Sequence, residues 1–243
     1  MPVQFESAST FNGVAGSATT VTVPAPAGIV EGDLLLALII NTGVTGSWTQ
    51  PSGWVELEDR QRLQDTDGPS ITYAFKIATA SEPGEYPWVF TAFAPGRKGL
   101  ILRFSGSPGV DVDGNVNGAL AGTVLCPDVV TTVADALVLR LSAGQSTGDV
   151  GTLSPPAGHT ERAEVSGFNT AISAHTEDTV QAAAGATGTE SIVKTGFTGT
   201  QKDIGITVVL APAAPPPGAG PPGGFKGPFR ILGRRWRALG TGA

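Results

Sequence analysis

A run of seven apolar residues, Leu34 to Ile40, follows Gly32-Asp33 and ends at the turn-forming segment Asn41-Thr42-Gly43. The run is short for a globular helix, and a continuous apolar run of this length is typical of a strand covered on both faces. A similar run, Leu137 to Leu141, follows Ala134-Asp135-Ala136 about a hundred residues later. The two runs therefore predict two central, doubly buried strands.

Three further landmarks follow each central run in the same order. Pro51-Ser52-Gly53-Trp54 matches Pro156-Ala157-Gly158-His159, Ile71–Lys76 matches Ala171–His175, and Gly99–Ser105 matches Gly205–Ala211. The four landmarks keep offsets of 100 to 106 residues, close to a repeat of about 105. They predict an internal duplication, with a first β repeat over 1–110 and a second over 111–211. The pattern leaves open whether the repeats fold as two sandwiches or as one.

Composition supports an all-β fold. The chain of 243 residues has 34 Gly and 19 Pro, and only 15% of its residues are charged. Many short apolar runs with turn residues between them predict one or more jelly-roll-like β-sandwiches. The chain has no apolar span long enough for a membrane helix, and its first residues do not resemble a secretion signal. The one cysteine, Cys126, excludes an internal disulfide, and we expect it to be a small buried hydrophobe.

The last part of the chain has a different character. Residues 212–224 form a Pro/Gly-rich linker, which favours an extended arm, and 225–243 form a basic, aromatic peptide. From residue 211 onward there are five basic residues and no acid. The rest therefore has ten basic and 21 acidic residues, a net charge of −11 against −6 for the whole chain.

Three hypotheses compete for the arm: plain disorder, contact with nucleic acid or a membrane through its arginines, and docking on a protein partner. Docking is favoured because Trp and Arg dominate binding hot spots, and nucleic acid is the least favoured partner. The expected docking residues are Phe225, Phe229, Arg230, Ile231, Leu232, Arg234, Arg235, Trp236 and Arg237.

Candidate catalytic residues are few. His159 and His175 are the two histidines, and we interpret both as ordinary packing or surface residues. Glu56 and Glu58 alternate on the solvent face of one predicted strand, which is the usual outward pattern. Zinc-type Cys/His spacing and a phosphate-binding loop are missing from the sequence. We therefore expect no enzymatic activity and no cofactor.

One segment has the spacing of a calcium loop. Asp111, Asp113, Asn115 and Asn117 place oxygen side chains at every second position. However, Val116 stands where the glycine of an EF-hand would be, and Gly122 stands where its closing Glu would be. The segment also falls between the two repeats, where Asp, Asn and Gly suit a tight linker turn. The turn is the favoured interpretation, and no metal site is predicted.

Several of these motifs together resemble a group of bacteriophage and prophage virion proteins of the minor tail or fibre-like type. The motifs are Glu31–Ala37, Pro51–Trp54, Tyr73–Ala78, Ser81-Glu82-Pro83, Ala134–Val138 and Gln181–Thr189. The resemblance covers roughly residues 20 to 212 and rests on structural motifs, so it brings no catalytic residues with it. It implies a non-enzymatic β module displayed on a virion that is assembled in the bacterial cytoplasm, where an absence of disulfides is usual.

Three functions follow as hypotheses. The first is a minor tail or fibre-like component, anchored to other virion proteins by its arm. The second is a capsid decoration or head-fibre protein docked on the major capsid lattice. The third is a carbohydrate-binding module for a host surface glycan. Trp48, expected in a loop, is the candidate for that third role, because Trp54 and Trp88 fit core positions of strands. The resemblance also implies a homo-oligomer, commonly a trimer.

Overall fold

The computed structural model describes residues 2–13, 19–42, 46–60, 70–91, 96–117, 122–167, 170–177 and 179–214, without the side chains of 58–60 and 115–117. In this part of the chain the regular structure is entirely β-strand, so the all-β prediction is confirmed. None of the same residues form a helix long and apolar enough to cross a membrane. Met1–Ala213 makes up one compact unit. The predicted arm lies almost wholly outside the described residues.

The first half of this unit contributes eight strands. They are β1 (Gln4–Gly13), β2 (Thr20–Pro24), β3 (Leu34–Asn41), β4 (Trp48–Thr49), β5 (Val55–Arg60), β6 (Ser70–Ile77), β7 (Glu85–Phe90) and β8 (Arg97–Ser105). Five of them form an antiparallel sheet in the order β1-β8-β3-β6-β5, and the other three form a sheet in the order β2-β7-β4.

The second half contributes ten strands. They are β9 (Gly109–Asn117), β10 (Thr123–Cys126), β11 (Val130–Thr131), β12 (Leu137–Ser146), β13 (Thr152–Ser154), β14 (His159–Gly167), β15 (Thr170–Glu177), β16 (Gly185–Ala186), β17 (Glu190–Thr195) and β18 (Gln201–Ala211). Their sheets have the orders β14-β15-β12-β18-β9 and β10-β17-β13, with a small extra sheet of β11 and β16. Apart from that extra sheet, the strand order of the first half recurs in the second.

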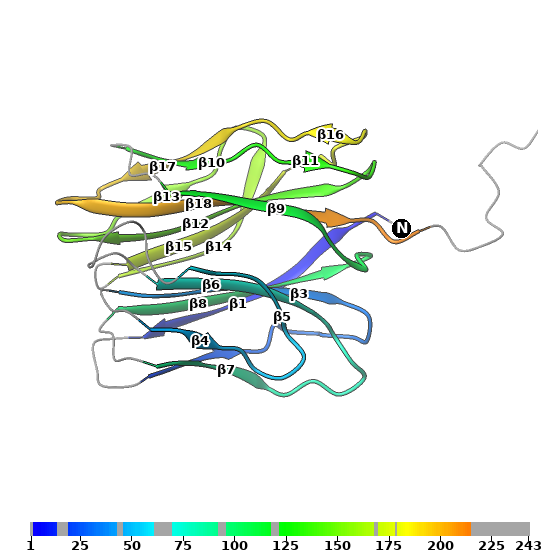
Figure 1. Ribbon diagram of the computed structural model, residues 1–243, viewed down its shortest axis with the longest axis horizontal. Helices are drawn as coiled ribbons and strands as arrows, with labels where there is room; N and C mark the ends of the chain where they lie inside the picture. The colour runs from blue at the N-terminus through cyan, green and yellow to red at the C-terminus, as the bar shows by residue number, and fades with distance from the viewer. Residues whose placement is uncertain are drawn as a thin grey trace, which may run out of the picture. The chain divides into compact units, whose positions relative to one another are not determined.

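The sheets stack as layers, with the two five-stranded sheets in the middle and the shorter sheets outside them (Figure 1). One hydrophobic core lies between the two five-stranded sheets and takes buried residues from both halves. From β3 it receives Leu34, Leu36, Leu38 and Ile40, and from β12 it receives Leu137, Leu139, Leu141 and Ala143. Burying a Leu or Ile side chain contributes about 1.5–3 kcal/mol to the free energy of folding. The shared core is therefore the main interaction that holds the two halves together.

The opposite faces of the same strands are also covered. In β3 the alternating residues Leu35, Ala37 and Ile39 point into a second core, beneath the sheet of β2, β7 and β4. All eight residues of β3 are therefore buried, which confirms the doubly covered strand predicted from its sequence. In the second half, Val124, Cys126 and Ile192 form a smaller core of this kind. Cys126 is fully buried, as predicted.

The prediction of a linker turn at Asp111–Gly118 is wrong. Residues 109–117 form strand β9, the edge strand of its sheet, which pairs with β18 and satisfies the backbone groups of β18 on that side. The two halves are instead joined by the short segment 106–108, where Gly106 has a φ of 73° and makes the reversal possible. A β-bulge sits near Asp111, because Val209 pairs with Val112 while Leu210 pairs with Val110.

Each long central sheet approaches its outer sheet closely at one glycine. A Cβ on Gly99 of β8 would press on the side chain of Val23, whereas a Cβ on Gly205 of β18 would overlap the backbone oxygen of Leu125. A side chain can move aside more easily than a backbone held in a strand.

We therefore predict that Gly205→Ala destabilises the protein more than Gly99→Ala does. Overpacking typically costs about 1–3 kcal/mol, and we expect Gly205→Ala at or above the top of that range and Gly99→Ala near the bottom. Denaturant unfolding of both variants measures the difference. Equal losses would show that the two contacts are equally adaptable.

Candidate functional site

The outer interior of the first half is apolar and aromatic. Trp54 meets Tyr86 and Trp88 edge to face, with ring centroids 5.2 and 5.1 Å apart. Trp54 and Trp88 are buried, as predicted. Trp48 was expected in an exposed loop, and that placement is wrong: it lies in β4, is 5% exposed and packs against Phe90 at 4.8 Å. A ring covered on this scale is not an open platform for a sugar.

The outer interior of the second half has small apolar clusters but also holds a group of buried polar residues, although its strands follow the same order. The strand pairing within each half shows which residues of the two halves correspond. Arg140 lies between His175 and Thr207, and Ala37 lies between Ala74 and Ile101 at the corresponding place. By the same register, Ser142 and Ser173 replace Ile39 and Thr72. The second-half residues Arg140, Ser142, Ser173, His175 and Thr207 are each at most 1% exposed.

The buried Arg140 guanidinium joins three segments of the second half. Its Nη1 donates to the carbonyl oxygen of Pro127 at 3.1 Å and to Thr207 Oγ1 at 2.7 Å. Its Nη2 donates to the carbonyl oxygens of Thr187 and Gly188 at 2.9 and 3.0 Å. The planar fork of arginine suits several acceptors at fixed angles, so one side chain fixes the loops on either side of the interior.

A serine–histidine pair lies next to Arg140. His175 Nε2 is 2.9 Å from Ser173 Oγ, which is itself 2.8 Å from Ser142 Oγ. A nucleophilic triad would need an acid on the other ring nitrogen, but His175 Nδ1 has no hydrogen-bond partner among the described residues. Burial, aided by nearby His159, lowers the pKa of His175 to about 4, so the ring is neutral and a weak base near pH 7.

A second cluster brings together His159, Glu177 and Glu190. His159 opens β14 and faces Glu177 across the strand pair, while Glu190 opens β17 in the outer sheet. His159 Nδ1 is 3.3 Å from Glu190 Oε2, and His159 Nε2 is 3.9 Å from Glu177 Oε1. One ligand atom from each residue lies within 4.8 Å of the others. Burial raises the pKa of the Glu177 carboxyl, and the charge of Glu190 adds to the rise while His159 and Arg140 oppose it.

Both histidines are buried rather than on the surface. His159 is 8% exposed and His175 is fully buried. His159 takes the place of Trp54 after the same Pro-x-Gly turn, as the sequence match predicted. The sequence match of His175 with the neighbourhood of Lys76 was less accurate. His175 pairs with Arg140, and Ala74 pairs with Ala37 in the same way. His175 therefore corresponds to Ala74.

The remaining predicted site residues do not form one site. All nine docking residues of the arm lie outside the described part of the chain. In the suspected calcium segment, Asp111 Oδ2 accepts hydrogen bonds from Thr131 Oγ1 and the Thr132 amide, whereas Asp113 Oδ2 accepts one from Tyr73. The two aspartates thus have separate partners. The side chains of Asn115 and Asn117 are outside the described residues.

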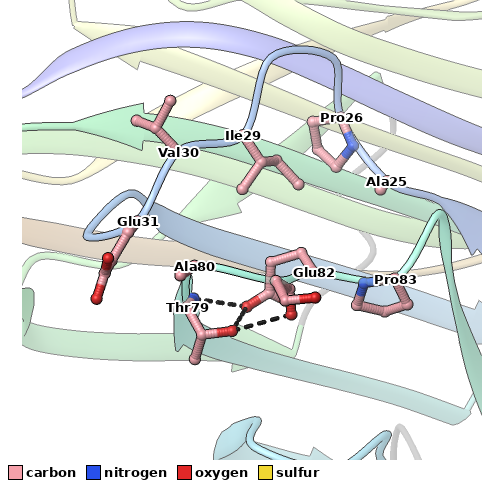
Figure 2. A pocket seen from close by; sticks show the side chains of 10 residues that line it. Ala25, Pro26, Ile29, Val30, Glu31, Thr79, Ala80, Glu82 and Pro83 are labelled. Atoms are coloured by element: carbon pink, nitrogen blue, oxygen red, sulfur yellow. Dashed lines mark hydrogen bonds between the residues drawn. The ribbon is translucent and has the colours of Figure 1, made fainter.

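A surface hollow of about 670 Å³ lies between the β2–β3 connection and the 79–83 turn of the first half (Figure 2). Glu82 organises its floor. The Glu82 carboxylate accepts hydrogen bonds from Lys76 Nζ at 2.7 Å, Tyr86 Oη at 2.9 Å and the Thr79 amide at 2.7 Å. Burial would raise the pKa of Glu82, but these bonds outweigh it and lower the pKa to about 2. The carboxylate is therefore fully engaged within the protein.

Comparison of the chain with protein-family models, with curated proteins and with solved structures found no significant match. The cluster of His159, Glu177 and Glu190, called the polar cluster below, therefore has to be interpreted from its own geometry.

Sequence reasoning missed Arg140, Glu177 and Glu190. One signal was present: Arg140 interrupts the second apolar run at the place where the first run has Ala37. A charged residue inside an otherwise buried strand indicates a paired or functional group. Its partners come from distant loops, so the sequence pattern could not name them.

We predict that Arg140→Met lowers the free energy of unfolding by about 3 kcal/mol or more, because four acceptors lose a buried charged donor. Arg162→Met is the matched control. Arg162 is only half-buried and makes one hydrogen bond, to Thr176, with its guanidinium 4.9 Å from the Phe5 ring. Chemical denaturation should show the smaller loss for Arg162→Met. A loss for Arg140→Met no larger than the control would contradict the role assigned to Arg140.

We also predict a pH-dependent role for Glu82. Its folded pKa of about 2 lies below its ordinary value of 4.5, so its ionised form stabilises the folded state above pH 4.5. That contribution, on the order of 2 kcal/mol, is lost as the pH falls from 4.5 to 2. Thermal unfolding should show Glu82→Gln less stable than wild type at pH 7 and equal to it near pH 2. The exposed Glu31→Gln in the same hollow should differ little at either pH.

Proposed function

We propose that this protein is a structural component of a bacteriophage virion, a minor tail or fibre-like protein that displays an acidic β body and is held by its C-terminal arm. The proposal rests on the resemblance of residues 20 to 212 to such virion proteins, and on the contrast between body and arm. The body has a net charge of −11 and the arm +5. The role it assigns to the protein is one of display and attachment, without chemistry.

The packing of the body supports this role. Residues of both faces of β3 are buried, and the two five-stranded sheets share one core. A body built in this way is stiff, which suits a part that must hold its shape on a particle. The serine–histidine pair is fully buried, and none of the described residues places an acid on His175 Nδ1, which favours a non-enzymatic protein.

We further propose that each half is a jelly roll and that the two arose by duplication of about 105 residues. A jelly roll pairs strands 1-8-3-6 in one sheet and 2-7-4-5 in the other. The first half has β1-β8-β3-β6 and β2-β7-β4, with β5 moved to the edge of the longer sheet, and the second half repeats this order. The corresponding glycines Gly99 and Gly205 and the Pro-x-Gly turns before Trp54 and His159 also support a common origin.

Deleting residues 225–243 tests the attachment. We expect the shortened protein to unfold at the same temperature as the full chain, because the compact unit ends at Ala213. It should be missing from purified particles when it is supplied in place of the full chain. Trp236→Ala alone should weaken incorporation, since a buried Trp anchor typically contributes more than 1 kcal/mol to binding. Unchanged incorporation of the shortened chain would disprove the docking role of the arm.

Labelling the full chain on virions gives the location. Signal at the tail would support the proposed role. Signal at regular sites over the head would replace it with capsid decoration and make the major capsid protein the partner.

A further inference from the structure

The cluster of His159, Glu177 and Glu190 has a composition suited to a metal ion. One imidazole and two carboxylates come from three strands, β14, β15 and β17, and from two different sheets. Their ligand atoms lie within 4.8 Å of one another, so small side-chain movements bring all three to coordination distance of one ion.

An independent observation points to a missing partner at this place. His159 is more than nine-tenths buried, and its Nε2 has no hydrogen-bond partner among the described residues; the nearest acidic oxygen, Glu177 Oε1, is 3.9 Å away. Glu190 Oε2 is buried and is likewise without a hydrogen bond. Buried polar atoms normally have partners, and a metal ion would serve both of these.

The charges around the cluster favour a cation. The two carboxylates lie on either side of the imidazole, and among the described residues the positive group paired with them is Arg140, whose Nε lies 3.9 Å from Glu190 Oε2. The other guanidinium nitrogens of Arg140 already donate four hydrogen bonds to neutral acceptors. With a neutral imidazole the cluster and Arg140 together carry one net negative charge, which a divalent ion would offset.

An ion also has a way in. The side chains of Glu177 and Glu190 are 19% and 30% exposed. Glu177 lines a hollow of about 310 Å³ together with Phe5, Leu137 and Arg162. Ligand positions beyond the three side chains can therefore be filled by water.

We propose that His159, Glu177 and Glu190 bind one divalent first-row transition metal ion, most readily Zn²⁺. The imidazole nitrogen selects against Ca²⁺ and Mg²⁺, which prefer oxygen ligands alone. The ion ties β14 and β15 of the central sheet to β17 of the outer sheet. In the first half, the stack of Trp54 on Tyr86 and Trp88 links the corresponding sheets. The metal thus performs in one half what aromatic packing performs in the other, and this role does not depend on the virion function.

The test uses the full chain without a histidine tag, freed of metal by a chelator. Calorimetric titration with ZnCl₂ should show one ion per chain, with at least tenfold weaker binding of CaCl₂ and MgCl₂. A hundredfold excess of Zn²⁺ over its Kd should raise the Tm by about 5 °C. Absence of zinc binding, or equal binding of all three ions, overturns the proposal.

Matched variants locate the ion. Glu177→Gln and Glu190→Gln keep the shape of the side chain and remove the anionic ligand, and each should weaken zinc binding at least about tenfold. Glu164→Gln is the control, because Glu164 lies on the same strand as His159 but binds the Leu153 amide instead. Unchanged zinc affinity in both of the first two variants would place the ion elsewhere and disprove the assignment.

A second readout needs no variant. The chain has two histidines, so its imidazole NMR spectrum contains two ring systems. Zinc should shift the ring nitrogens of His159 strongly and those of His175 much less. A His159 ring that does not respond to bound zinc overturns the proposal even if every variant fails to fold.

Discussion

The structure depends on the burial of both faces of the two five-stranded sheets. Strands β3 and β12 send alternate side chains into the shared central core, with Leu36 and Leu139 as examples. A strand with two buried faces cannot alternate between apolar and polar residues. This constraint explains why the unbroken apolar runs are the strongest signals in the sequence, and why the two halves are one compact unit.

Because the central core holds the halves together, the two outer interiors are free to differ. One is filled by Trp54, Tyr86 and Trp88, and the other combines small apolar clusters with buried charged and hydroxyl side chains. Buried charge is costly, and the second interior offsets the cost only where each group finds a partner. Arg140 finds four neutral acceptors, and Lys194 pairs with Asp203 at 2.5 Å. The balance is incomplete at several buried atoms of the described residues, among them His159 Nε2, Glu190 Oε2 and His175 Nδ1.

The sequence was informative where a pattern reflects burial directly. The spacing of apolar residues and the positions of turn residues correctly predicted the all-β fold, the doubly buried run at Leu34–Ile40 and the core positions of Trp54 and Trp88. The failures share one cause. Trp48 and the 109–117 segment lie in strands whose neighbours come from distant parts of the chain, and no local pattern indicates such a neighbour. A strand can have the same alternating sequence pattern whether its second face contacts water or another sheet.

The same limit explains why the polar cluster was missed. Its three members lie at strand ends, at His159, Glu177 and Glu190, where local sequence favours polar residues for ordinary reasons. Only the strand register brings them together, and only the comparison with the first half shows that a polar group replaces an aromatic one. A sheet interior that exchanges a tryptophan for a histidine loses large apolar contacts and gains directional ones. If the proposed metal ion binds, such an exchange makes the link between the sheets dependent on that ion, whereas the aromatic stack needs no ligand.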